Sequence, residues 1–247
     1  MLKIQRMRSQ NGFTLVELII SVALGIAAVS AIMFFYVSNL SSSYTTLKSS
    51  KLNQEIATLM TLMVQDIRRA GYGSLTSNAD ASNNPFSNVD TRLAIYITGS
   101  DTEIGESDED DGTASCIVFA YDKDIDLTPD NDDFFGFRLN GSEVEFRVNG
   151  TDNKGCEDDN NVWESITDSS EIIVDFLSFS LDGSLCTGGT DDGVTFDCYA
   201  TSPGSGDRTV ETRLVTINIS AYLADDSDVR ISRTEKVRVR NDHVRIR

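Results

Sequence analysis

One uninterrupted apolar run near the N-terminus constrains this chain more than any other feature of its sequence. The run covers residues 13–37 and follows a short polar stretch that carries Lys3, Arg6 and Arg8. A helix of about 20 apolar residues crosses a bilayer, so a run of this length predicts a membrane span. Basic residues in front of the span predict that this end stays in the cytoplasm.

A single carboxylate, Glu17, lies inside the apolar run, close to its start, and Gly12 directly precedes the run. A charge in a membrane span costs at least about 2.5 kcal/mol, so it is seldom kept there without a partner. This glutamate argues against a secretory signal peptide cleaved near residues 28–30. An ordinary anchor needs neither Gly12 nor Glu17 at this spacing, and a buried helix of a soluble enzyme would be shorter.

The junction resembles the N-terminus of type IV pilin-like proteins, in which prepilin peptidase cuts after a leader glycine and N-methylates the next residue. The resemblance implies a leader over residues 1–12, cleavage between Gly12 and Phe13, and N-methylation of Phe13. It also implies that Glu17 neutralises the N-terminal ammonium of a neighbouring subunit as helices pack into a filament. Burying either charge alone is costly, whereas burying the pair is tolerable.

The helix is expected to continue beyond the apolar run, because residues 38–70 contain neither proline nor glycine. Apolar residues recur there at steps of three and four, the period of an amphipathic helix: Leu52, Ile56, Leu59, Met63, Ile67 and Ala70. Gly71 and Gly73 predict its end. Residues 13–37 therefore form a transmembrane or filament-core half, and residues 38–71 form an amphipathic half.

Residues 72–247 are expected to form an acidic, β-rich globular head. Strands are expected over residues 92–98, 115–121, 134–139, 143–148, 171–181, 194–200, 212–223 and 229–240, with residues 225–228 as the last turn. Asn140 and Gly141 predict a hairpin between two of these strands. The expected fold class is α+β, with the long helix packed on an antiparallel sheet as in pilins.

Charge and motifs exclude several classes of function. The chain has 39 acidic and 21 basic residues, and an acidic body disfavours nucleic-acid binding. No Gly-x-Ser-x-Gly motif, phosphate loop or dinucleotide fingerprint occurs, so no enzymatic activity is expected. His243 is expected in a basic C-terminal tail, and the basic residues of the last strand are expected to pair with the acidic body. An interaction surface for an acidic neighbouring subunit is the alternative reading of that strand.

The four cysteines, Cys116, Cys156, Cys186 and Cys198, all lie in the acidic body. An even number outside the cytoplasm predicts two disulfides. Of the three connectivities, we favour the pairing of sequence neighbours, Cys116 with Cys156 and Cys186 with Cys198. A zinc site is disfavoured, because the sequence has no CxxC spacing and only one histidine.

Asp122, Asp124 and Asp126 place oxygens at every second position, as the first half of an EF-hand loop does. The pattern then departs from that motif, because Leu127 replaces the glycine and Asp133 replaces the glutamate of the twelfth position. A looser calcium loop and a solvated acidic loop are both compatible with this pattern. No other cofactor is expected.

Residues 24–25, 66–72, 116–122 and 135–139 resemble segments of PilW-type minor pilins, which prime and tip type IV pili. The same segments overlap with those of the J-type pseudopilins of type II secretion. The resemblance implies a single span in the bacterial inner membrane, a periplasmic head, and later a place in a pilus on the cell surface. Implied partners are major and minor pilins, prepilin peptidase and the inner-membrane assembly platform. Further alternatives are a calcium-dependent tip adhesin and, least favoured, an anchored periplasmic hydrolase.

Overall fold

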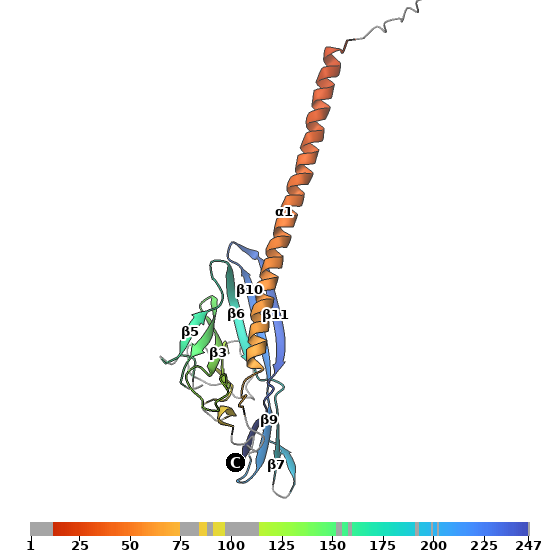
Figure 1. Ribbon diagram of the computed structural model, residues 1–247. Coiled ribbons are helices and arrows are strands. Elements are labelled where there is room, and N and C mark those ends of the chain that lie inside the picture. The colour runs from red at the N-terminus through yellow and green to blue at the C-terminus, as the bar shows by residue number, and fades with distance from the viewer. Residues whose placement is uncertain are drawn as a thin grey trace, which may run out of the picture. The chain divides into compact units, whose positions relative to one another are not determined.

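The computed structural model describes residues 12–74, 84–87, 91–96, 114–151, 155–157, 160–190, 193–198, 200–201 and 203–246. The chain divides into two compact units, Met1–Lys48 and Ser49–Arg247, each described here by itself (Figure 1). The elements in chain order are α1 (Leu15–Ile67), the 3₁₀-helix η2 (Pro85–Ser87), β1 (Ala94–Tyr96), β2 (Cys116–Ala120), β3 (Phe134–Asn140), β4 (Glu143–Asn149), β5 (Val162–Ser165), β6 (Ile172–Ser180), β7 (Leu185–Gly189), β8 (Thr195–Asp197), β9 (Arg208–Thr212), β10 (Leu214–Leu223), β11 (Asp226–Arg238) and β12 (His243–Ile246).

In the first unit, α1 buries none of its side chains. Every residue from Gly12 to Leu47 is exposed, including the whole apolar run. The hydroxyls of Ser21 and Ser30 donate to the carbonyl oxygens one turn earlier, at 2.7 and 2.8 Å. Both hydroxyls thus find hydrogen-bond acceptors within the helix, so they need no water or other partner in an apolar surrounding. Within the described part of the chain, α1 alone is long and apolar enough to cross a membrane.

In the second unit, α1 buries the apolar stripe that its sequence predicts. Leu52, Ile56, Leu59, Met60, Met63 and Ile67 are all buried. The helix ends at Ile67, and a turn carries the chain to Gly71, whose positive φ of 73° suits glycine. The Gly71 N–H donates to the Ala120 carbonyl at 2.8 Å, which ties the end of the helix to β2.

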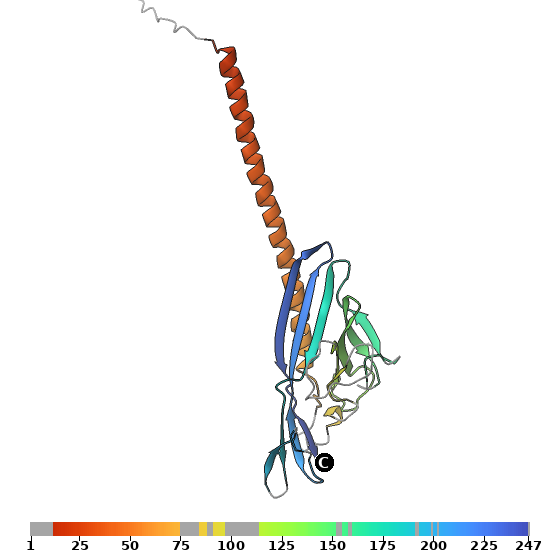
Figure 2. The same cartoon turned by 180° about the vertical axis from the view of Figure 1, so that it is seen from behind.

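All strand pairs described are antiparallel, and they form three sheets. The first has the order β1-β2-β3-β4-β5, the second β11-β10-β6, and the third β12-β9-β7-β8. Figure 2 shows β6, β10 and β11 lying across the part of α1 that belongs to the second unit. The arrangement is the expected α+β, pilin-like fold.

One apolar core joins the helical stripe to the first two sheets of the head. Aromatic side chains of β2, β3 and β4 fill its centre, and the rings of Tyr121 and Phe135 stack with centroids 4.2 Å apart. Backbone hydrogen bonds from Val174 to Ser142 and from Phe179 to Ala114 join β6 to the first sheet. The helix, the second sheet and the first sheet therefore share one hydrophobic interior.

Several strand predictions were wrong in extent. The strand expected over residues 194–200 is only Thr195–Asp197. Of the turn expected at residues 225–228, the last three residues belong to β11. The strands β5, β7, β9 and β12 are not among those expected from the sequence. These strands are short, and β7 and β9 are rich in Thr, Gly and charged residues. Strands of this kind lack the apolar alternation that identifies a strand from sequence.

Candidate functional site

The predicted processing junction lies just outside the helix. Gly12, Phe13 and Thr14 are not helical, and α1 begins at Leu15. Phe13 is 83% exposed. Residues 1–11 of the expected leader lie outside the described part of the chain. The structure therefore places the peptide bond between Gly12 and Phe13 in an accessible, non-helical segment.

Glu17 lies in the first turn of α1, where Thr14 caps the helix. The Glu17 N–H donates to the Thr14 hydroxyl at 3.3 Å, and Thr-x-x-Glu is the pattern of a capping box. A carboxylate at this end of a helix is also favoured by the helix dipole. No described side chain pairs with the Glu17 carboxylate, so it is available to a group outside this chain. The Thr14 cap is a local signal that the sequence itself carries.

Two disulfides brace the head, in the same pairing that sequence proximity predicts. The first joins Cys116 of β2 to Cys156, and both residues are buried. The second joins Cys186 of β7 to Cys198, directly after β8, and both are half-buried. The first bond ties a loop to the largest sheet, and the second closes the β7–β8 hairpin.

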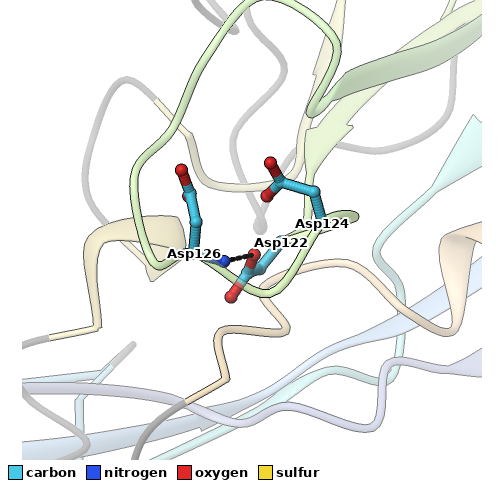
Figure 3. Close-up of side chains that lie close together, drawn as sticks. All are labelled: Asp122, Asp124 and Asp126. Carbon is cyan, nitrogen blue, oxygen red and sulfur yellow. Dashed lines mark hydrogen bonds between the residues drawn. The ribbon is translucent and has the colours of Figure 1, made fainter.

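Asp122, Asp124 and Asp126 come together in the loop after β2, with one oxygen from each within 4.8 Å of the others (Figure 3). Asp122 is buried, and the other two are exposed. The Asp122 carboxylate accepts hydrogen bonds from the backbone N–H groups of Ser74 and Asp126, at 2.9 and 3.1 Å. Burial opposes its ionisation, but these bonds outweigh burial and hold the Asp122 pKa below its ordinary value.

The same loop departs from the EF-hand sequence at Leu127 and at Asp133. Leu127 has a φ of 63°, so it takes the left-handed conformation that glycine takes in the motif. The Asp133 carboxylate, at the twelfth position, accepts hydrogen bonds from the backbone N–H groups of Lys123 and Asp130 at 2.8 and 3.2 Å. Both Asp133 carboxylate oxygens are therefore already hydrogen-bonded to backbone N–H groups of the loop. Calcium binding by this loop stays a prediction.

The basic residues of the last long strand do not all pair with the acidic body. Arg230 pairs with Asp175, while Arg233 donates to the Asn53 side chain at 2.6 Å. Arg238 reaches Asp242 at 3.4 Å, and Arg240 pairs with no described carboxylate. The expectation of salt bridges therefore holds for only part of this strand.

The expectation of a basic tail around His243 was wrong. His243 lies in β12 and is buried, with its Nδ1 3.0 Å from the Glu211 carboxylate. The same oxygen accepts a hydrogen bond from Arg213 at 3.1 Å. Pairing of this kind is what allows charged groups to be buried at the join of β9 and β12. A sequence pattern could not show it, because Glu211 and His243 are 32 residues apart.

Comparisons with known families agree with the geometry of both units. The family model described as Prepilin peptidase-dependent protein B matches residues 45–239. The model described as Prokaryotic N-terminal methylation motif matches residues 7–33, across the junction and the first part of α1. Comparisons with curated proteins and with solved structures gave no match.

The first match covers well over half of the chain and includes most of the head. The second covers the segment that contains Gly12, Phe13 and Glu17. The apolar helix and this motif fit a membrane-anchored protein. The chain therefore belongs to the family of prepilin peptidase-dependent protein B and is a type IV pilin-like protein.

Proposed function

We propose that this chain is a minor pilin-like subunit of a type IV pilus that primes or caps filament assembly. Prepilin peptidase removes residues 1–12 and methylates Phe13. Residues 13–37 hold the protein in the inner membrane and later pack in the filament core, while the acidic head from residue 72 onward lies in the periplasm. The second half of α1, from residue 38 to Ile67, joins these two parts.

One observation carries this proposal: every residue from Gly12 to Leu47 is exposed, yet most residues in the first half of α1 are apolar. Such a surface must be covered, by lipid before assembly and by other helices afterwards. Glu17 is the one acidic group in this surface, and it lacks a partner among the described residues. An ammonium from a neighbouring subunit supplies the charge that makes its burial tolerable.

Two measurements on the mature protein test the proposal. Mass spectrometry of the N-terminus should find methyl-Phe13, and an intact Met1 would contradict processing. Glu17→Ala should insert in the membrane normally and be absent from sheared filaments. The control is Glu235→Ala, which removes the same charge from an exposed head position with no described partner. Normal incorporation of Glu17→Ala would contradict the pairing role.

The alternative within the family is a J-type pseudopilin of a type II secretion system. Both proposals use the same processing and helix packing, so they differ only in the filament that the subunit joins. Deleting the gene should abolish surface pili if the pilus proposal is right. Loss of secreted proteins with intact pili would favour the pseudopilin.

A further inference from the structure

Three arginine residues line one hollow where α1 ends in the head. The hollow has a volume of about 350 Å³ and is lined by Arg68, Arg238, Val239 and Arg240. We call it the arginine hollow. The chain as a whole has a net charge of −18. No carboxylate is among the described residues of the lining, so its positive side chains repel one another. A bound anion would relieve that repulsion.

The backbone beneath these side chains is fixed by hydrogen bonds between distant segments. The Arg240 N–H donates to the Arg68 carbonyl at 3.1 Å, and the Val239 N–H donates to the Arg213 carbonyl at 3.0 Å. The Asn241 amide donates to the Ala70 carbonyl at 3.0 Å. The hollow therefore has a preformed floor, which lowers the entropy lost when a ligand binds.

Two of the three arginines form no ion pair with a carboxylate of the described residues. Neither Arg68 nor Arg240 pairs with a carboxylate among the described residues, and Arg238 reaches Asp242 only at 3.4 Å. The side chains of that pair are 63% and 33% exposed, so the pair contributes little. Elsewhere in the head, Arg138 is held at 2.6 Å from Glu145. The hollow thus differs from the paired arginines of the same domain.

The negative end of the α1 dipole offers a simpler reason for basic residues here. Cations near a helix C-terminus gain about 0.3–1 kcal/mol. This accounts for Arg68, which directly follows the last helical residue. It does not by itself account for Arg238, the last residue of β11, or for Arg240, two residues further on, which line the same hollow. The dipole predicts an effect on stability alone.

We propose that the arginine hollow binds the carboxylates of an acidic segment on a neighbouring filament subunit. The proposal rests on the proposed function, which supplies that neighbour. A guanidinium binds a carboxylate through two parallel hydrogen bonds, and several guanidiniums in one hollow select closely spaced Asp or Glu residues. Acidic heads repel one another, so a fixed basic hollow sets where and in which orientation two subunits meet.

The test measures binding of a fluorescein-labelled hexaglutamate peptide to the full chain in a non-ionic detergent, by fluorescence anisotropy. The wild type should bind, and added salt should weaken the binding. The triple variant Arg68→Gln, Arg238→Gln, Arg240→Gln should lose at least about tenfold in affinity, or 1.4 kcal/mol. The single variant Arg240→Gln, whose side chain makes no described ion pair, should lose about threefold and covers the case of a poorly folding triple variant.

A matched triple variant controls for net charge: Lys51→Gln, Lys123→Gln, Arg230→Gln. Each of these residues is already paired with a carboxylate. The control should keep the wild-type affinity, and an equal loss in both triples would overturn the proposal.

Two other results would also overturn it. Displacement of the peptide by inorganic phosphate at an equal concentration would mean a site for small anions instead of a carboxylate segment. A lower melting temperature with unchanged peptide binding would mean that the arginines only stabilise the helix end. The peptide measurement does not depend on filament incorporation, so its failure and that of Glu17→Ala are distinguishable.

Discussion

The side-chain amide of Asn241 donates a hydrogen bond to the Ala70 carbonyl at 3.0 Å, although 171 residues separate the two. The same amide lies 3.2 Å from the Arg69 carbonyl. The last carbonyls of a helix have no partner within it, and a local glycine motif often supplies one. Here the C-terminal segment holds the turn that directly follows the helix and closes the head on itself.

Asn241→Ala should destabilise the head by about 1–2 kcal/mol, because it removes the described hydrogen-bond partner of the partly buried Ala70 carbonyl. The measurement is chemical denaturation in detergent, followed by the fluorescence of Trp163. Asn131→Ala is the control, since the exposed Asn131 side chain makes no described hydrogen bond. Equal effects of the two substitutions would contradict the capping role.

Gly136→Ala should destabilise the central sheet by about 1–3 kcal/mol. A Cβ at Gly136 would lie 2.7 Å from the Ile117 carbonyl oxygen and 3.0 Å from the Trp163 ring. The carbonyl belongs to a paired strand and cannot move aside cheaply. Gly189→Ala, on β7, would meet nothing within 4 Å and should be close to neutral. Circular dichroism during thermal unfolding compares the two, and a neutral Gly136→Ala would show that the sheet yields at this point.

The two disulfides should differ in both strength and accessibility. In the chain-entropy model the bond between Cys116 and Cys156 stabilises by about 4 kcal/mol and that between Cys186 and Cys198 by about 3 kcal/mol. The first closes a loop of sequence separation 40, the second one of 12. Under mild reduction the half-buried second bond should open first, because Cys116 and Cys156 are almost completely buried. Alkylation followed by mass spectrometry gives the order, and the reverse order would contradict this prediction.

Glu143 should make the head more stable at neutral pH than in acid. Its carboxylate accepts hydrogen bonds from the hydroxyls of Ser165 and Ser169, both at 2.6 Å, and these hold its pKa below the ordinary value of 4.5. A depressed pKa contributes stability above the ordinary value, and that contribution is lost as the pH falls through the folded-state pKa. Glu143→Gln should therefore lower the melting temperature at pH 7, with a difference from wild type that shrinks toward about pH 3.

Glu164→Gln is the control for that measurement. Glu164 lies on the neighbouring β5 and is exposed, and its side chain makes no hydrogen bond among the described residues. Its melting temperature should follow that of the wild type across the pH range. A Glu143→Gln difference that is constant with pH would show that the ionised carboxylate is not the stabilising form.

Local signals in the sequence determined the N-terminal helix of this protein and the junction before it. An apolar run, a preceding glycine and a single glutamate are adjacent in the chain, and a helical period extends over neighbouring residues, so no distant contact was needed to read them. Proximity also predicted the disulfide pairing. The Thr14 cap was equally local and could have been read in the same way.

Only the tertiary structure decided what lies at the end of the helix and in the third sheet. The Asn241 cap, the pairing of His243 with Glu211, and the arginine hollow each join residues from distant segments. Arg147 is another example, since it is completely buried with its guanidinium over the Phe134 ring. Which charged groups are buried or left unpaired depends on strand order and register, and residue type and spacing along the chain do not contain that information.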